Sequence, residues 1–176
     1  MVDLLTSRQG RENQRYSQET GGRLVVGCVP YRLKNGAIGA ASISDIDQLE
    51  ILIISSQKPK ERYFLFPKGG WENDETKKEA ACREALEEAG IYGKIMGKRL
   101  GKWKYRKIEK GGVFNEGTMF AMYVTGELTH WPEIRKRIWV SVAEAKQACS
   151  LDWMREALDN LVQRLLLFPP ETMKVE

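Results

Sequence analysis

The sequence predicts one α/β domain in which a mixed β-sheet is flanked by helices. Short apolar runs rich in β-branched residues occur together with longer stretches whose apolar residues recur at helical spacing. These strand and helix patterns do not alternate regularly, which favours a mixed sheet over a parallel one. The chain has 176 residues, 42% hydrophobic and 30% charged, as expected for one globular domain with a substantial core.

Three strands are predicted in the first part of the chain. Residues 24–29 and 49–54 are continuous apolar runs, which are typical of buried strands. Residues 63–66 form a shorter strand that ends at Pro67. Small and polar residues between positions 34 and 47 predict a hairpin loop or a surface insertion.

A helix is predicted to begin near Thr76 and to stop at Gly90. Thr76 and Glu79 have the spacing of a capping box, and glycine is typical of the position just after a helix. One side of this helix carries small apolar residues, which we expect to pack on the sheet. The other side carries three glutamates at positions i, i+3 and i+4, which we expect to face outward: Glu84, Glu87 and Glu88.

The remaining elements are three strands and two helices. Residues 100–105 and 113–124 are predicted strands, and residues 136–140 form another short one. Residues 142–149 and 152–167 have helical spacing of apolar residues. These elements complete the predicted mixed sheet and its helical cover.

We divide the chain into a polar N-terminal arm (residues 1–22), a single domain (residues 23–168) and a C-terminal tail (residues 169–176). No apolar run reaches the length of a membrane span, and the N-terminus lacks the apolar core of a secretory signal. The cysteines lack metal-ligand spacing, so we expect reduced, buried thiols: Cys28, Cys82 and Cys149. These features predict a cytoplasmic, or else nuclear, protein, with a monomer as the default.

The three glutamates carry the main chemical signal. Like charges at this spacing repel one another and destabilise a helix, so the chain needs either a solvated helix face or a bound cation. Hard divalent cations such as Mg²⁺ bind carboxylates together with the phosphates of a substrate. The pattern therefore indicates cleavage of a phosphate ester or a phosphoanhydride.

The run from Gly69 to Ile91 resembles the Nudix box, Gly-x5-Glu-x7-Arg-Glu-U-x-Glu-Glu-x-Gly-U, where U is a bulky aliphatic residue. The second U is Ile91, whereas the first is Ala85, which is smaller than usual. Every fixed position is filled, by Gly69, Glu75, Arg83, Glu84, Glu87, Glu88 and Gly90. The resemblance implies a Nudix hydrolase with an α/β/α sandwich in which the box forms a loop-helix-loop.

The resemblance also implies the roles of the box residues. Glu84 and Glu88 would be the main ligands of Mg²⁺ or Mn²⁺, and Glu87 would be the general base or a further ligand. Arg83 would orient the carboxylates, and the backbone carbonyl near Lys68 would add a ligand. Gly69 and Gly70 would let the backbone approach metal and phosphate closely.

Segments outside the box resemble the diphosphoinositol polyphosphate phosphohydrolase branch, and its plant-type members in particular. The stretches that carry this likeness are 23–32, 53–58, 66–72, 101–103, 131–139 and 153–158. The branch cleaves diphosphoinositol polyphosphates and diadenosine polyphosphates, which are small polyanions. The residues that we expect to bind phosphate are Arg23, Arg32, Ser56, Lys58 and Arg135.

A basic segment between Lys94 and Lys110 suits such substrates, because it carries more positive charge than the net +4 of the whole chain. Two other functions remain open. One is a pyrophosphatase of nucleotide sugars, ADP-ribose, NADH or capped mRNA. The other is a binding module for polyanions or RNA without catalysis, which the intact glutamates argue against; nucleic acid is thus a possible but not a favoured partner.

Overall fold

The computed structural model describes residues 6–34, 46–58, 63–106, 112–133 and 135–167. It contains one seven-stranded sheet with the strand order β3-β2-β1-β6-β5. The short strands β4 and β7 pair with β1 and β2, outside that order. The strands are β1 (Leu24–Leu33), β2 (Leu49–Ser55), β3 (Phe64–Leu65), β4 (Lys68–Gly70), β5 (Ile91–Tyr105), β6 (Asn115–Glu127) and β7 (Arg137–Val140).

The sheet is mixed, as the sequence predicts. β1 runs parallel to β6 and antiparallel to β2 and β4, whereas β5 runs antiparallel to β6. β1 lies in the middle of the sheet and is buried along most of its length, which explains its continuous apolar sequence. β5 lies at the edge of the sheet order.

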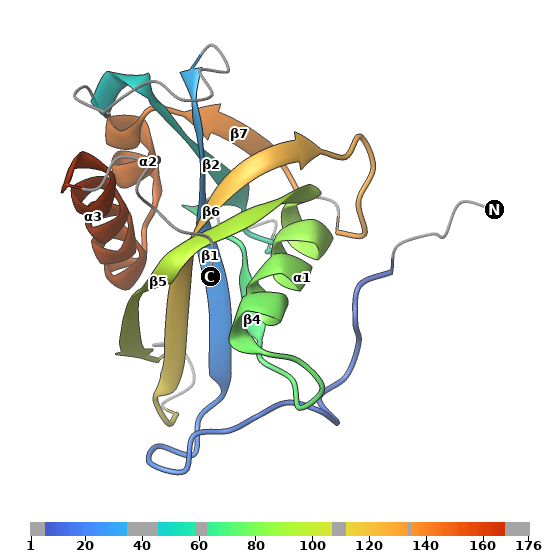
Figure 1. Ribbon diagram of the computed structural model, residues 1–176. Helices are drawn as coiled ribbons and strands as arrows, with labels where there is room; N and C mark the ends of the chain where they lie inside the picture. The colour runs from blue at the N-terminus through green and yellow to red at the C-terminus, as the bar shows by residue number, and fades with distance from the viewer. Residues whose placement is uncertain (1–5, 35–45, 59–62, 107–111, 134, 168–176) are drawn as a thin grey trace.

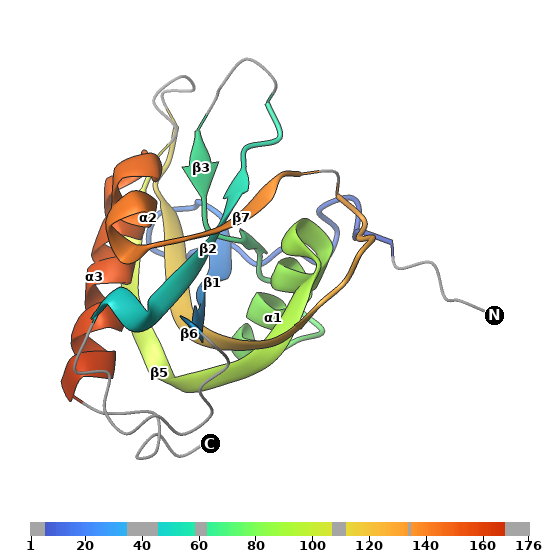
Figure 2. The same cartoon turned by 90° about the horizontal axis from the view of Figure 1, so that it is seen from above.

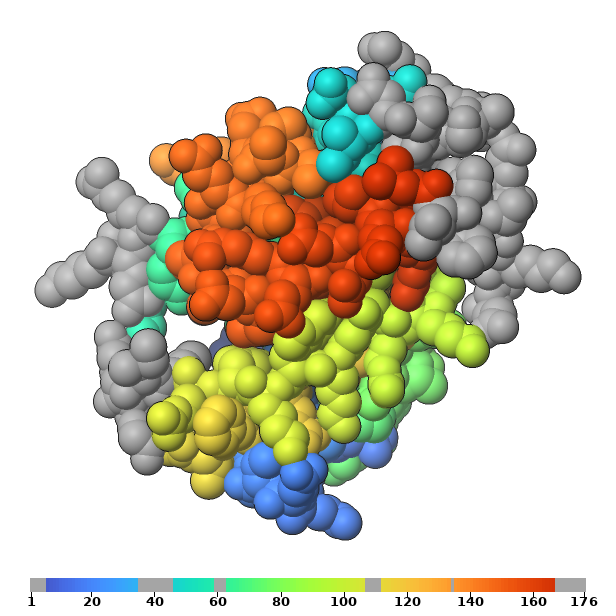
Figure 3. Space-filling view, turned by 90° about the vertical axis from the view of Figure 1, so that its left-hand side faces the viewer, coloured from blue at the N-terminus to red at the C-terminus, as the bar shows by residue number. Residues whose placement is uncertain are grey.

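Helices cover both faces of this sheet, which gives the expected α/β/α sandwich. The helices are α1 (Lys77–Ala89), α2 (Val142–Ala148) and α3 (Asp152–Leu167), with a short 3-10 helix, η2 (Ile46–Gln48), before β2. Figures 1 and 2 show α1 on one side of the sheet and α2 with α3 on the other. In the space-filling view, α2 and α3 form one continuous face beside the side chains of β5 (Figure 3).

Most predicted helices and strands agree with the structure, and two differences concern the sheet, while most of the predicted loop or insertion at residues 34–47 lies outside the described residues. β4 was not predicted, because its glycines carry no strand pattern and the strand exists only through pairing with β1. β5 begins at Ile91 rather than at Leu100, because its first half alternates basic, glycine and apolar residues at an exposed edge. In the described part of the chain, no helix combines the length and apolar character needed to cross a membrane.

The N-terminal arm, where it is described, lies against the domain. Isolated β-bridges join Gln14 to Glu72 and Tyr16 to Arg23. The arm thereby passes along the loop between β4 and α1, which is the loop of the Nudix-like box (Figure 1). The predicted C-terminal tail, residues 169–176, falls outside the described residues.

Candidate active site

The helix that carries the glutamates is fixed at both ends. The hydroxyl of Thr76 accepts a hydrogen bond from the Glu79 N–H, which confirms the predicted N-cap. Gly90 adopts a left-handed conformation with φ 61°, and its N–H donates to carbonyls of the last turn. Because the helix is regular between these caps, its glutamates at i, i+3 and i+4 lie on one face.

The glutamate face is buried, so the prediction that it faces outward is wrong. Glu84, Glu87 and Glu88 are only 7%, 7% and 6% exposed. The opposite side of α1 is buried too, because its alanines allow the helix to lie close to the sheet. A solvated face therefore does not relieve the repulsion between the carboxylates, which leaves neighbouring cations as the explanation.

Arg83 supplies one of these cations. Its guanidinium donates to both carboxylate oxygens of Glu75, at 2.6 and 2.9 Å, and to Glu84 at 2.8 Å. It also contacts Glu87 at 3.3 Å and the Gly70 carbonyl at 2.9 Å. Arg83 thus connects the helix to the loop before it, and it holds one oxygen of each of two helix carboxylates.

Glu88 is held from two other elements. One carboxylate oxygen accepts the Lys68 N–H of β4 at 3.1 Å, and the other accepts Arg135 at 3.0 Å. Arg135 precedes β7 and also donates to Glu133 and to the Ser55 carbonyl. Its side chain is 7% exposed, so it lies in a buried ion-pair network rather than on an open phosphate-binding surface.

Two adjacent glycines of β4 face different groups, Gly69 the helix α1 and Gly70 the N-terminal arm. A Cβ atom on Gly69 would stand 2.1 Å from a carboxylate oxygen of Glu84. A Cβ atom on Gly70 would stand 1.9 Å from the amide oxygen of Gln14 and 2.9 Å from the guanidinium of Arg23. A side chain at either position would displace the polar group that faces it, so glycine allows this close approach.

Burial changes the titration of the helix carboxylates. Loss of hydration raises the pKa of Glu84 to about 7 and that of Glu88 to about 8, although Arg83 and Arg135 oppose the change. Burial also raises the pKa of Glu87, where the Arg8 N–H and Arg83 oppose it. The negative charge of Glu133 adds to the rise in all three.

This donor set fits a hard divalent cation. Carboxylate oxygens are the ligands that Mg²⁺ and Mn²⁺ prefer, and three carboxylates lie on one face of a single helix. The acids around the site outnumber the arginines that pair with them, so a further positive charge is favourable. A cation would also offset the cost of keeping Glu84 and Glu88 ionised while buried.

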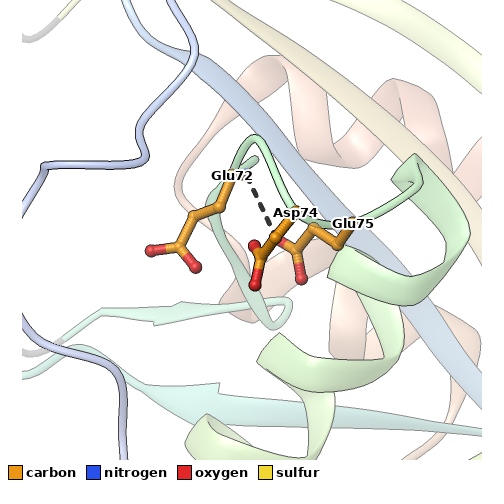
Figure 4. A group of neighbouring side chains, drawn as sticks. All are labelled: Glu72, Asp74 and Glu75. Carbon is orange, nitrogen blue, oxygen red and sulfur yellow. Dashed lines mark hydrogen bonds between the residues drawn. The ribbon is translucent and has the colours of Figure 1, made fainter.

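A second acidic group lies in the loop before α1 (Figure 4). Ligand atoms of Glu72, Asp74 and Glu75 lie within 4.8 Å of one another, and the Glu72 N–H donates to Glu75 at 3.1 Å. Arginines already pair with all three acids, because Arg8 binds Glu72 and Asp74 while Arg83 binds Glu75. This group therefore forms the rim of the site, and we assign it no ion of its own.

The other predicted phosphate-binding residues lie at different distances from the glutamates. Arg23 lies beside Gly70, and Ser56 follows Ser55, whose carbonyl binds Arg135. Lys58 is exposed two residues further along. Arg32 is not brought to the site: it lies five residues beyond Gly27 on β1, roughly 16 Å along the strand. There it pairs with Glu50 and Glu127 and stacks on Trp139.

The predicted basic segment keeps to the sheet edge. Lys102 pairs with Glu116 at 3.6 Å, and Lys104 pairs with Glu19, so their described ion pairs do not involve the glutamate cluster. Residues 107–110 of the segment lie outside the described residues. The structure thus gives local partners to the two lysines that were expected to attract a substrate.

Two residues of the site were not predicted. Glu133 lies between β6 and β7, and its N–H donates to the Glu87 carbonyl at 3.1 Å. Arg8 belongs to the N-terminal arm, and its N–H donates to the Glu87 carboxylate at 3.2 Å. Neither has a fixed spacing from the box, so only the folded chain brings them to the helix.

The cysteines and the single histidine take no part in this site. Cys28 and Cys149 are buried, Cys82 is half-buried, and all three are free thiols as predicted. Burial raises the pKa of Cys28 well above its usual value, so this thiol stays protonated. His130 is exposed. A Cys-His or Ser-His mechanism therefore has no support in the geometry.

Known proteins of one family are similar to this chain. The NUDIX domain family model matches residues 34–165. The chain is 52% identical to Nudix hydrolase 18, mitochondrial, of Arabidopsis thaliana, over 97% of this chain and 92% of that protein. It is also 52% identical to Nudix hydrolase 17, mitochondrial, of the same plant, over 92% and 84%. The Ap4A hydrolase of C. elegans shares the fold, with a TM-score of 0.60 and 20% identity over 82% of this chain and 98% of that one.

The same relatives overturn the expected location. Both Arabidopsis proteins are named mitochondrial, so the prediction of a cytoplasmic or nuclear protein is wrong. The error has a physical origin. The prediction considered only a secretory signal, which needs an apolar core, whereas mitochondrial transit peptides are amphipathic and rich in arginine and serine.

Proposed function

This chain belongs to the Nudix hydrolase family, and from that premise we propose that it cleaves phosphoanhydride bonds of diphosphoinositol polyphosphates and diadenosine polyphosphates with the help of Mg²⁺ or Mn²⁺. The observation that carries the metal-dependent part is the buried face of α1. Three carboxylates share that face at i, i+3 and i+4, and burial disfavours their ionised forms. Such a face is costly to maintain unless a cation binds it.

We assign the cation to Glu84 and Glu88, with Glu87 as a further ligand or as the general base. When bound, the cation would neutralise phosphate oxygens and make a water molecule more acidic. Glu87 lies at the side of the cluster, where one of its oxygens faces the Arg8 N–H and the other faces Arg83. Its carboxylate can take a proton from the attacking water once the substrate is in place.

The remaining side chains hold this arrangement in register. Arg83 and Arg135 keep the carboxylates apart from one another, and each bridges the helix to a neighbouring loop. Such pre-organisation matters because phosphoryl transfer depends mainly on positioning and on charge stabilisation. Loss of either arginine should therefore disturb turnover through geometry.

The substrate assignment rests on the resemblance described above and on the basic residues near the site. Arg23 next to Gly70, and Ser56 and Lys58 after β2, remain our candidates for phosphate binding, together with the backbone of Gly69 and Gly70. Arg135 is a candidate for phosphate binding only if a phosphate replaces Glu88 as the partner of its guanidinium. A polyanion with several phosphates would have donors on both sides of β4.

A turnover assay on a panel of substrates tests this proposal. The panel holds an inositol pyrophosphate, a diadenosine polyphosphate, ADP-ribose and capped RNA, each with Mg²⁺. We expect the first two to lead, and Glu88→Gln to reduce turnover at least about 100-fold because a metal ligand is lost. Glu79→Gln is the matched control, since Glu79 is an exposed glutamate of the same helix.

The outcomes separate the two parts of the proposal. Full activity of Glu88→Gln would contradict the assigned metal site. Preference for ADP-ribose or capped RNA, with an inactive Glu88→Gln variant, would keep the site and reject the substrate class. A mitochondrial location is part of the proposal, because the Arabidopsis relatives bear that name. Import of the full chain into isolated mitochondria tests it.

A further inference from the structure

Ser7 and Arg8, near the start of the described chain, contact acidic residues of α1 and of the two loops beside it. Ser7 donates to the Glu133 carboxylate at 3.4 Å, in the loop between β6 and β7. The Arg8 N–H donates to Glu87 of α1 at 3.2 Å. The Arg8 guanidinium binds Glu72 and Asp74, at the rim shown in Figure 4. Two adjacent residues thus connect the helix with both loops.

The rest of the arm anchors these two residues. The Arg15 N–H donates to the Trp71 carbonyl at 2.9 Å, and its guanidinium donates to the carbonyls of Glu72 and Asn73 at 3.0 Å. The same guanidinium lies 4.1 Å from the centre of the Trp71 ring. The buried Gln14 fills the space beside Gly70. The arm is therefore attached along the loop between β4 and α1 by residues beyond Ser7 and Arg8 as well.

The two oxygens of Glu87 show why this attachment matters. Arg83 holds one oxygen from within the helix, and the Arg8 N–H holds the other from outside it. A carboxylate with one donor on each oxygen has a fixed orientation, whereas one donor leaves it free to rotate. The ion pairs of the Arg8 guanidinium with the rim acids help to hold the Arg8 N–H in place.

We propose that Arg8 is a positioning residue for the reaction, which acts through Glu87 and makes the N-terminal arm a part of the active site. This inference rests on the proposed function for its effect on turnover. Its effect on cation binding does not depend on the substrate. Arg8 does not touch the reacting atoms. It orients Glu87 by its main chain and fixes the box loop by its side chain.

The test compares Arg8→Ala and Arg8→Lys with Arg11→Ala. Arg11 lies on the same arm, and among the described residues its side chain makes no hydrogen bond or ion pair, so it controls for loss of one positive charge. We expect Arg8→Ala to lower kcat about tenfold with KM within about twofold, as for lost outer-shell partners. Arg8→Lys should recover part of kcat, and Arg11→Ala should match the wild type.

Mn²⁺ titration followed by electron paramagnetic resonance gives an independent readout. Removal of a positive charge near the cation should by itself strengthen Mn²⁺ binding. Loss of a positioned ligand should weaken it, and we expect Arg8→Ala to bind Mn²⁺ several-fold more weakly than Arg11→Ala. Tighter binding, or equal kcat in the two alanine variants, would overturn the proposal. If the wild type cleaves no phosphoanhydride, the proposed function fails while the Mn²⁺ titration still decides the role of Arg8.

Discussion

The glutamate face of α1 and the basic edge strand β5 both carry dense charge of one sign, but the fold treats them differently. The glutamates are buried, and arginines from three parts of the chain bind them. The basic residues of β5 are exposed, and Lys102 and Lys104 pair with nearby acids. Charge kept in a buried site is costly and needs a function, whereas charge at a sheet edge costs little.

The edge position supplies a structural reason for the basic residues. An edge strand offers unpaired backbone groups to other chains, and lysines on such a strand discourage pairing between molecules. β5 occupies this position, and its lysines alternate with half-buried residues along the exposed side. Positive charge in β5 is therefore explained without a substrate, whereas the acids at the glutamate face outnumber the arginines that pair with them.

The largest effect should come from the contact between β4 and the glutamate face. Gly69→Ala places a Cβ atom 2.1 Å from a Glu84 oxygen, so the carboxylate must move. We expect kcat to fall about 100-fold, since displacements near 1 Å can cost that much. Gly70→Ala is the matched variant, because it meets Gln14 and Arg23 instead. Equal losses of kcat in the two variants would show that β4 itself was disrupted.

The next largest effect should come from Arg135→Met, which we expect to lower the stability of the fold. The substitution leaves Glu88 buried without its ion pair, and we expect a loss of about 3–5 kcal/mol in unfolding free energy. Arg32→Met breaks ion pairs of a more exposed arginine and should cost about 0–1 kcal/mol. Urea denaturation of both variants measures the difference. Unchanged stability with a raised KM would instead make Arg135 a phosphate ligand.

A moderate effect is expected from pH in the absence of metal. The folded protein raises the pKa of Glu84 to about 7 and of Glu88 to about 8, so it binds protons more tightly than the unfolded chain. Their contribution to stability is complete below the unfolded value and is lost as pH rises through 7 and 8. With EDTA, the melting temperature should thus be higher at pH 6 than at pH 9.

Added Mg²⁺ should reverse this trend, because it binds the ionised carboxylates. The rise in melting temperature on adding Mg²⁺ should be larger at pH 9 than at pH 6. Scanning calorimetry at both pH values, with Mg²⁺ or with EDTA, checks the sign. A metal-free protein that becomes more stable between pH 6 and pH 9 would contradict the raised pKa values.

The smallest effect should come from the basic edge strand. Lys104→Gln removes an exposed ion pair, so we expect less than about 1 kcal/mol of lost stability and less than about threefold change in KM. Steady-state kinetics at low and high salt measures this. A tenfold rise in KM that high salt abolishes would return β5 to the role of a substrate-attracting surface.

Local signals in the sequence predicted most of the fold. α3 has the predicted bounds, and α1 begins and ends at its predicted caps, because capping and helical periodicity act within a few residues. β4 escaped prediction, since a glycine-rich strand depends on its partner. The burial of the glutamates also escaped, because two loops and the N-terminal arm cover them only in the folded chain.

The site divides in the same way. Box spacing alone placed Arg83 with Glu84 and Glu87, which share one helix. Arg8 and Glu133 come from distant parts of the chain, and no spacing links them to the box. Arg32 shows the reverse case. It belongs to a stretch that resembles the phosphohydrolase branch, but it lies at the end of β1 that is far from the glutamates. The sequence predicted site residues that lie close together along the chain, but not those that only the fold brings together.

The paired glycines of β4 limit how the enzyme can be redesigned. A side chain at position 69 would clash with the Glu84 carboxylate, and one at position 70 would clash with the Gln14 and Arg23 side chains. Mutational libraries aimed at a new substrate should therefore leave this strand unchanged, because a side chain at either position would displace Glu84 or Gln14. Diversity belongs at exposed neighbours such as Lys58, where a new side chain can meet a ligand without displacing a catalytic group.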